Sequence, residues 1–421
     1  MERERALLGR TAAETRESAN GWLDSIARRM VLSCLEQLRD GRLRVVEQGQ
    51  VSDFGEGGEP VVIQIHHPRT WRALLSGGSI GVAEAYIRRD WCCDDLTALV
   101  QLFCRNLPAL DRLERAASWL TGPISRMHHL FNRNSRSGSK RNIVAHYDLS
   151  NPFYQLFLDT RMMYSSAIYA DEQMDLEAAA EYKLKVICDK LQLKPGDHLL
   201  EIGTGWGGLA VYAARHYGCR VTTTTISDAQ YQHACELVRD EGLEGQITLL
   251  KEDYRNLSGQ YDKLVSVEMI EAVGHQYLPR YFTQLGRLLK ADGMALIQAI
   301  TIADQRYDQY VGSVDFIQRY IFPGGSLPSL AVMARHVAER SDMVIRQVED
   351  IGLDYARTLA DWRSRFEASL PQVRELGFSE AFIRLWRFYL CYCEGGFRER
   401  AISTVHLLMT KPRQRAATPQ R

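Results

Sequence analysis

The chain has 421 residues, of which 45% are hydrophobic and 25% charged, and its 52 basic side chains balance 52 acidic ones. This length predicts two domains with sizeable cores, and the ordinary composition excludes a wholly disordered chain. The even charge balance disfavours a nucleic-acid binder, and no apolar stretch reaches the ~18 residues of a membrane span. The first residues lack the apolar segment of a secretory signal.

The nine cysteines form no recognisable framework and show no zinc-ligand spacing. Cys92 and Cys93 are adjacent, while Cys391 and Cys393 form C-x-C. We therefore expect free thiols in a cytoplasmic protein, and no metal site.

Residues 1–120 are expected to form a small α+β domain. Residues 1–20 are highly charged and predicted to be loose, and apolar residues at helical spacing predict a helix over 22–38. The stretches "GRLRVVEQGQ" and "PVVIQIHHP" predict strands, and the segment from "SGGSIG" to "LFCRN" predicts a loop followed by helices. We expect this domain to contact lipid, the membrane or the second subunit of a homodimer.

A linker over residues 121–140 is rich in Ser, Asn, Gly and Arg. Its basic side chains are not interrupted by an acid. It is either a solvated connector or a contact for anionic lipid headgroups, where each basic side chain contributes ~1 kcal/mol.

Helix and strand patterns alternate from residue 176 onward. The predicted strands are "DHLLEI", "CRVTTTTI", "QITLL", "YDKLVSV" and "GMALIQAITI". Such alternation predicts an α/β fold with a doubly wound, mostly parallel sheet, whose ligands bind beyond the carboxyl ends of the strands. We assign residues 141–410 to this domain and residues 411–421 to a disordered tail.

The stretch "LLEIGTGWGGLA" (199–210) places a glycine-rich loop after the first of these strands. Gly203, Gly205 and Gly208 fit the dinucleotide fingerprint, whereas Gly203, Gly205 and Gly207 fit the G-x-G-x-G turn of an S-adenosylmethionine (SAM) methyltransferase. A dinucleotide fold places an acid at the end of the second strand, but "CRVTTTTI" ends in threonines. This weakens the dinucleotide interpretation without excluding it.

Further motifs favour the methyltransferase. They are "HYDLSNPFYQLFLDTRMMYSSAIY" (146–169), "TISDAQ" (225–230), "EDYRNL" (252–257), "SVEMIEAVG" (266–274) and "YIFPGG" (320–325). With the glycine loop they resemble the cyclopropane fatty acid synthase family of SAM-dependent methyltransferases, which includes mycolic acid methyltransferase-like members. The resemblance covers roughly residues 141–410, and it implies a class I methyltransferase fold with SAM as the methyl donor.

The resemblance also implies a set of cofactor-binding residues, many of them at strand ends. They are Tyr147, Tyr164, Ser165, Glu201, Gly203, Gly205, Gly207, Thr225, Ile226, Gln230, Asp253 and Tyr254. Glu201 can pair with the amino group of the methionine moiety, and tyrosine ring faces attract a sulfonium cation. Ser227 and Gln230 also form a capping box, and the structural and ligand roles can hold together.

Glu268 and Glu271 lie three residues apart after an apolar strand. On a helical turn they would face similar directions, and we expect at least one to be partly buried. The resemblance implies Glu271 as the catalytic glutamate, and Tyr389 as a tyrosine that contacts an active-site anion.

The family uses a bound bicarbonate as the base, held by groups at five positions. In this chain they are Glu271, Tyr389, Ile300, Ser166 and Gln298, where the last two replace the usual cysteine and histidine. The two replacements leave open whether bicarbonate binds, and whether the product is a cyclopropane ring or a methyl or methylene branch.

The favoured function is therefore transfer of a SAM-derived methylene or methyl group to double bonds in unsaturated acyl chains of phospholipids, which gives cyclopropane fatty acids through a carbocation at the inner face of the membrane. Two alternatives are a SAM methyltransferase for a small polar molecule and a non-catalytic lipid-binding protein. The stretch "DQYVGSVDFIQRYIFPGG" is rich in apolar residues, which suits an acyl chain better than a polar substrate.

Overall fold

The computed structural model describes residues 21–107 and 149–415. The expectations for residues 1–20, for the linker over 121–140 and for Tyr147 lie outside the described residues, as do those for residues 416–421 of the tail.

The N-terminal part is a small α+β unit, as predicted. Its elements are α2 (Gly21–Leu35), β1 (Gly41–Glu47), β2 (Gln50–Glu56), β3 (Val61–Ile65), α3 (Arg69–Ile87), β4 (Trp91–Cys93) and α4 (Leu96–Arg105). The strands form one sheet in the order β2-β1-β3-β4, in which only β1 and β3 run parallel. Inward side chains such as Leu43, Val45 and Ile63 pack under α2, α3 and α4.

Three local features of this unit differ from the expectation. The stretch "GRLRVVEQGQ" is not one strand, because Gln48 and Gly49 both have positive φ and turn the chain into a β1–β2 hairpin. The expected loop at "SGGS" lies inside α3, which is kinked at Gly78. The short β4 was not predicted, since three residues are too few to show a periodicity.

The C-terminal part contains a seven-stranded sheet in the order β10-β11-β9-β8-β5-β6-β7. Its strands are β5 (His198–Ile202), β6 (Arg220–Thr224), β7 (Ile247–Leu250), β8 (Tyr261–Val267), β9 (Leu289–Ile302), β10 (Val344–Asp350) and β11 (Ile402–Thr410). The pairs from β9 to β7 are parallel, whereas β11 is antiparallel to both β9 and β10. The mostly parallel sheet is confirmed.

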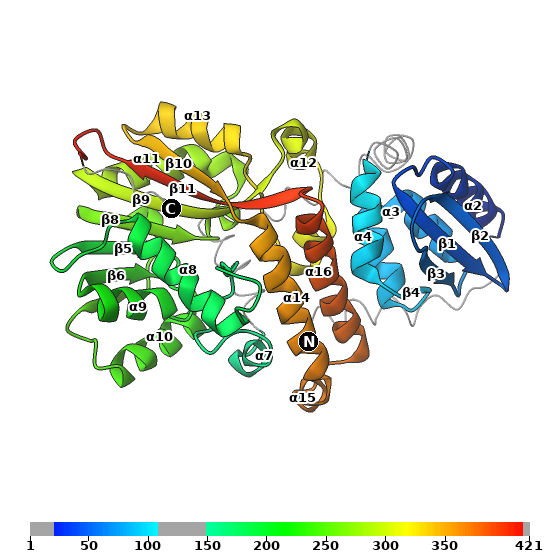
Figure 1. Cartoon of the computed structure of the whole chain (residues 1–421), viewed down its shortest axis with the longest axis horizontal. Helices are drawn as coiled ribbons and strands as arrows, with labels where there is room; N and C mark the ends of the chain where they lie inside the picture. Colours follow the sequence, from blue (N-terminus) through cyan, green and yellow to red (C-terminus); the bar gives the residue numbers. More distant parts are fainter. Residues whose placement is uncertain (1–20, 108–148, 416–421) are drawn as a thin grey trace.

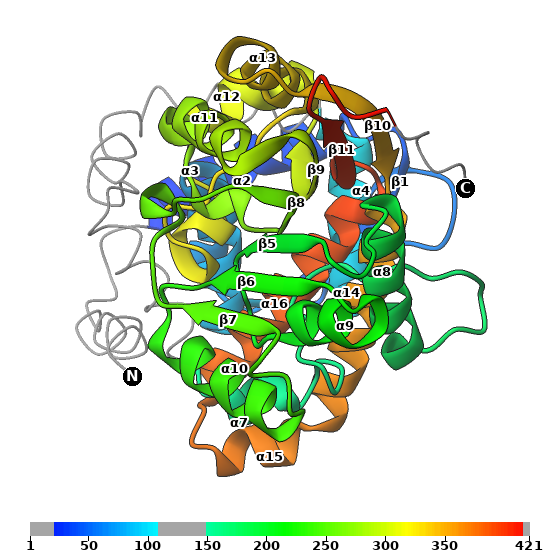
Figure 2. The same ribbon diagram turned by 90° about the vertical axis from the view of Figure 1, so that its left-hand side faces the viewer.

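Helices cover both faces of this sheet (Figure 2). On one face are α8 (Leu176–Lys190), α9 (Gly208–Tyr217) and α10 (Asp228–Asp240), and on the other α11 (Leu278–Leu288) and α13 (Leu330–Arg340). The other helices of this part are α7 (Asn151–Gln155), α12 (Tyr307–Val311), α14 (Gly352–Ala368), α15 (Leu370–Glu375) and α16 (Glu380–Arg398). Leu199 packs with α8 and α9 on one face, and Leu200 with α11 and α13 on the other. A strand covered on both faces is continuously apolar, which explains "HLLEI".

Helices α14 and α16 stand between the large sheet and the N-terminal unit (Figure 1). Helix α16 packs against α4, and Gly395 allows a close approach, because a Cβ there would lie 2.7 Å from Val100. Thr97 Oγ1 donates to Glu394 at 3.2 Å and Arg105 pairs with Glu399 at 2.9 Å. The two parts therefore share a packed, hydrogen-bonded interface.

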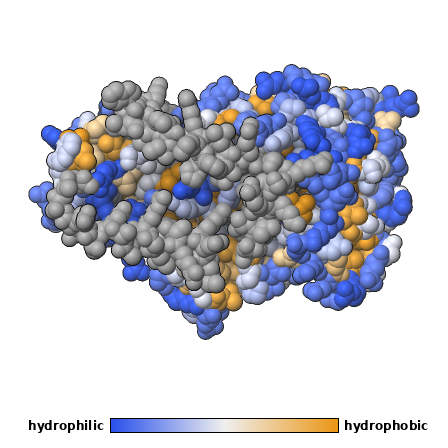
Figure 3. Space-filling view, turned by 180° about the vertical axis from the view of Figure 1, so that it is seen from behind, coloured by the Kyte–Doolittle hydropathy of each residue, from blue (hydrophilic) through white to orange (hydrophobic). Residues whose placement is uncertain are grey.

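The outer surface is mainly hydrophilic where the described residues are visible from behind (Figure 3). Within residues 21–107 and 149–415, no helix combines the length and apolarity needed to cross a bilayer.

Candidate active site

The glycine loop leaves β5 at the point where the order of the sheet reverses, between β5 and β8. Gly203, Gly205 and Gly207 have φ values of 100°, 54° and 98°, a backbone region that glycine adopts without strain. A Cβ on Gly205 would meet no protein atom within 4 Å, whereas one on Gly208 would meet Met163 Sδ at 2.8 Å. Gly208 therefore serves packing, and Gly205 leaves space for a ligand.

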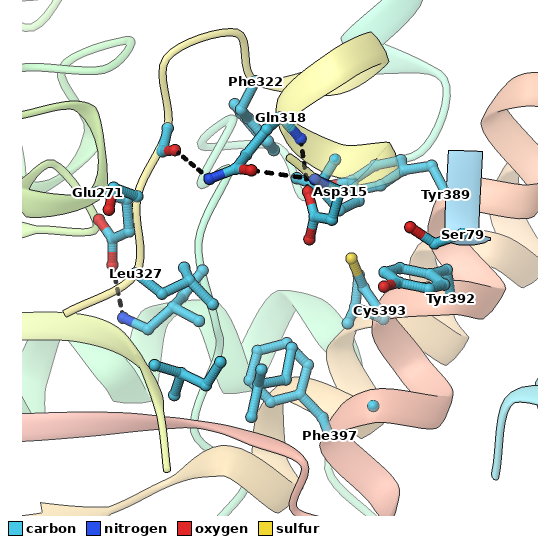
Figure 4. Close-up of a pocket in the computed structure, with 18 of the residues that line it drawn as sticks. Ser79, Glu271, Asp315, Gln318, Phe322, Leu327, Tyr389, Tyr392, Cys393 and Phe397 are labelled. Carbon is cyan, nitrogen blue, oxygen red and sulfur yellow. Dashed lines mark hydrogen bonds between the residues drawn. The ribbon is translucent and has the colours of Figure 1, made fainter. Parts of the chain in front are cut away.

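A cavity of about 670 Å³ extends from this loop to the N-terminal unit. Figure 4 shows Glu271 at one side and Tyr392, Cys393 and Ser79 at the other, with Phe397 and Leu327 between them. Most of the lining in the view is apolar or aromatic, but Asp315 and Gln318 hydrogen-bond each other within it. The cavity thus joins a polar loop site to a long apolar space.

Many of the predicted site residues lie on this one cavity. The ones that line it are Tyr164, Ser165, Glu201, Gly203, Gly205, Thr225, Ile226, Gln230, Asp253, Tyr254, Glu271, Ile300 and Tyr389. Gly207, Ser166 and Gln298 do not line it. Gly207 instead caps the start of α9, and Ser166 and Gln298 are fully buried behind the cavity wall.

The predicted cap at Ser227 is confirmed, because Ser227 Oγ accepts the backbone N–H of Gln230 at 3.3 Å. The reciprocal half of the capping box is absent. Thr225 Oγ1 donates to Gln230 Oε1 at 2.9 Å, and the Ser227 N–H donates to Thr225 Oγ1 at 3.1 Å. The Gln230 side chain therefore faces the cavity edge beside Thr225.

Glu201 is a buried carboxyl at the end of β5. It accepts a hydrogen bond from Thr223 Oγ1 at 2.6 Å, and burial raises its pKa to about 8. A neutral buried acid that ionises when a cation arrives suits an ammonium ligand. Farther along the same edge, Asp253 accepts from Arg255 Nε at 2.8 Å, and the Tyr254 ring packs edge-on against Tyr281.

Glu271 lies in a short 3-10 turn over Ile270–Ala272 after β8. Its Oε1 accepts the Ile300 backbone N–H at 2.5 Å, while its buried Oε2 has no hydrogen-bond partner among the described residues. Burial, with repulsion from Glu268, raises the pKa of Glu271 to about 8. An unpartnered buried carboxyl oxygen is rare outside functional sites.

The spacing suggested that Glu268 and Glu271 share a helical turn, but Glu268 lies before the turn that contains Glu271. It follows β8 with φ of 46°, which is strained for a residue with a side chain. Its Oε1 accepts from Ser166 N at 2.9 Å and from Gln298 Nε2 at 2.8 Å, and its Oε2 accepts from Tyr355 OH at 2.9 Å. The expected partial burial of at least one glutamate is confirmed, because both residues are half-buried.

Sequence reasoning missed several residues that complete this arrangement. Tyr355 lies on α14, and His406 on β11 contacts Gln298 Oε1 through Nε2 at 3.0 Å. Lys183 on α8 is fully buried and donates to Ser165 Oγ at 2.7 Å. A lysine inside an apolar helix face was the one visible signal. Tyr389, in contrast, contacts Tyr164 at 3.0 Å between hydroxyls.

The donors at this site do not fit a bound bicarbonate. A small anion needs free N–H or O–H groups, but Ser166 N, Gln298 Nε2 and Tyr355 OH already donate to Glu268, and Ile300 N donates to Glu271. The Ser166 hydroxyl donates to Ala167 O at 2.9 Å. The loop region, by comparison, fits SAM, since Gly205 faces open space beside the buried Glu201.

Comparisons with known proteins agree with this geometry. The family model described as mycolic acid cyclopropane synthetase matches residues 134–407. The cyclopropane-fatty-acyl-phospholipid synthase of Escherichia coli is 37% identical over 91% of this chain and 97% of its own length. The tuberculostearic acid methyltransferase of Mycobacterium tuberculosis is 36% identical over 79% of each chain.

Solved structures show the same fold. The crystal structure of the mycolic acid cyclopropane synthase CmaA1 complexed with SAH and CTAB is 30% identical, with a TM-score of 0.61 over 65% of this chain and 98% of that chain. The cyclopropane synthase MmaA2 from Mycobacterium tuberculosis is 28% identical over the same shares, also with a TM-score of 0.61. The chain belongs to the mycolic acid cyclopropane synthetase family and is a SAM-dependent methyltransferase.

Proposed function

We propose that this enzyme transfers a SAM-derived methyl group to a double bond in an unsaturated acyl chain of a phospholipid and closes a cyclopropane ring. The observation that carries the proposal is the single cavity that joins the glycine loop to a long apolar lining. The phospholipid synthase of E. coli, which matches almost the whole chain, supports the same substrate class.

The residues at the strand ends would hold SAM. We assign the glycine loop and Glu201 to the methionine part, Thr225, Ile226 and Gln230 to the ribose and adenine, and Asp253 and Tyr254 to the adenine. When bound, SAM supplies a methyl group that becomes bonded to one carbon of the double bond and leaves a cation on the other. The rings of Tyr164, Phe322 and Tyr389 line the cavity and stabilise such a cation through their electron-rich faces.

Glu271 is the proposed proton acceptor. Ring closure breaks one C–H bond of the transferred methyl group, whose electrons form the second C–C bond, and the proton goes to the Glu271 carboxylate. Oε1 is held by Ile300 N, which leaves Oε2 to receive the proton. The apolar walls exclude water that would otherwise trap the cation.

We also propose that α2 docks the enzyme on the membrane. Trp22, Ile26 and Met30 recur every four residues on this helix and expose 64%, 36% and 37% of their surface. Arg28 and Arg29 lie between them in the sequence. An exposed apolar stripe beside basic side chains suits insertion into the interface of an anionic bilayer.

Mass spectrometry of lipids tests this function. Cells that express the protein should gain phospholipid acyl chains that are heavier by one CH₂ and have lost a double bond to a ring. A methylene or methyl branch at the same carbon would support the proposed substrate but show that the product is not a cyclopropane ring. Unchanged lipids, together with methylation of a small polar metabolite, would contradict the proposal.

A further inference from the structure

Glu268 is surrounded by more protein donors than a typical surface carboxylate. Three hydrogen-bond donors reach it from separate segments, namely Ser166 N, Gln298 Nε2 and Tyr355 OH. Together they donate to both carboxylate oxygens of Glu268. Burial raises the pKa of Glu268, but these hydrogen bonds and the Lys183 ammonium, fully buried on α8, oppose that rise and favour the charged form. This is a cradle for an anion, and the chain fills it with its own carboxylate.

A chain of hydrogen bonds sets the orientation of the Gln298 amide, which donates to Glu268 from β9. Lys190 Nζ lies 2.9 Å from His406 Nδ1 and also pairs with Glu349, while His406 Nε2 lies 3.0 Å from Gln298 Oε1. Burial and the two nearby lysines lower the pKa of His406 well below its ordinary value, so the ring is neutral. Lys190 then donates to Nδ1 and Nε2–H donates to the amide oxygen. The Gln298 NH₂ group is thereby turned toward Glu268.

The backbone of Glu268 has a conformation that is strained for a residue with a side chain. Its φ of 46° is a conformation in which glycine would be unstrained. The backbone is nevertheless held there, with the Glu268 N–H donating to Gln298 O at 2.8 Å. Strain of this kind persists where the surrounding structure holds the residue in place, and here the three hydrogen bonds to the Glu268 carboxylate help to do so.

We propose that Glu268 is the built-in anion of this active site, occupying the place that a bound bicarbonate would need, so that the enzyme works without bicarbonate. The inference rests on the proposed function. Glu268 is a positioning residue: its charge keeps the neighbouring Glu271 strongly basic, while Glu271 takes the proton. Repulsion between the two carboxylates is one cause of the raised pKa of Glu271, second to burial.

The test compares wild type with Glu268→Gly in buffer freed of bicarbonate and in buffer with bicarbonate added. Purified full-length protein receives SAM and vesicles of unsaturated phospholipid, and the modified acyl chains are counted by mass spectrometry. Wild type should give the same rate in both buffers. Above pH 8, where Glu271 is ionised in both proteins, Glu268→Gly should lose roughly tenfold or more without bicarbonate, because it leaves three donors unpaired and makes Glu271 a weaker base.

Added bicarbonate should restore the variant by filling the emptied cradle. Without it, the rise of rate with pH should move to lower pH in the variant, because Glu271 loses a like-charged neighbour. Gln48→Gly is the matched control, since Gln48 has φ of 49° in the distant β1–β2 turn. It should match wild type in both buffers, and thermal unfolding confirms that each variant is folded.

The outcomes separate the two claims. Wild type that needs bicarbonate, or a glycine variant that keeps full activity without it or is not rescued by it, would overturn the inference while leaving the proposed function in place. Wild type that makes no lipid product in either buffer would overturn the proposed function and the inference with it.

Discussion

Among single residues, the glycines of the loop after β5 differ in what their backbone geometry makes possible. Gly203, Gly205 and Gly207 all have positive φ, but they differ in what surrounds them. A side chain on Gly207 would press on Ala234, whereas one on Gly205 would enter the cavity. Gly207 and Gly208 are both closely packed, so the choice between the two glycine patterns is made by the family to which the chain belongs.

Gly205→Val should therefore reduce SAM affinity strongly. The valine side chain fills the space next to the loop, and its backbone is strained at φ of 54°. Gly242→Val controls for the strain, because Gly242 has φ of 66° and also faces open space, but away from the cavity. Calorimetric titration with SAM should show a loss in the first variant alone, and equal affinity in both would refute the loop assignment.

We expect Glu201 to make SAM binding depend on pH. Its pKa of about 8 means that it is mostly protonated at neutral pH, and it must ionise to pair with the ligand's ammonium group. Binding should therefore release close to one proton at neutral pH, measured by calorimetry in buffers of different ionisation enthalpy. Glu201→Gln should bind more weakly and release none. A wild-type titration without proton release would contradict this role.

Much of the candidate site could be predicted from the sequence, but the hydrogen bonds among its residues could not. Glu271 and the glycine loop could be found because they sit in motifs at strand ends. Tyr355 and His406 could not, because they reach Glu268 and Gln298 from α14 and β11, far along the chain. Only the packing of those elements brings them together, and no local pattern reports it.

At the scale of elements, strands with continuous apolar character were predicted well, while the two antiparallel strands were not. In β10, exposed side chains alternate with half-buried ones, but the apolar Val344 and Val348 are on the exposed side, at 42% each. The strand therefore shows little of the periodicity on which a prediction rests. Strand β11 was obscured by its position directly after the long helix α16.

Helix α2 carries the prediction for membrane attachment. A Trp22→Ser/Ile26→Ser double variant removes exposed apolar area without touching the buried Ala27, Val31 and Leu35. Binding to anionic vesicles, measured by sedimentation, should fall several-fold, and wild-type binding should weaken as salt screens the basic side chains. Leu353→Ser, at a residue with 50% exposure on α14, should bind like wild type. Equal binding by all three proteins, or equal binding to neutral vesicles, would count against α2.

In the whole molecule, the N-terminal unit and the methyltransferase sheet meet through α4, α14 and α16 (Figure 1). The cavity extends across this interface, because residues of both parts line it. Ser79 on α3 and Glu271 lie at opposite sides of the same cavity, which residues of α16 also line (Figure 4). The N-terminal unit thus forms part of the cavity wall and also contains α2. This joint role was not foreseeable from two separately predicted domains.

In the proposed reaction, Glu271 completes a SAM-dependent modification of an acyl double bond. The direct measurement is the rate and product of wild type and Glu271→Gln with SAM and unsaturated phospholipid vesicles, read by mass spectrometry across a range of pH. Wild type should form the ring with a rate that rises toward about pH 8, where Glu271 ionises. The glutamine variant should lose ~10²-fold or more, as general-base losses run, and shift its product away from the ring. A glutamine variant with near-normal rate and unchanged product would contradict the account.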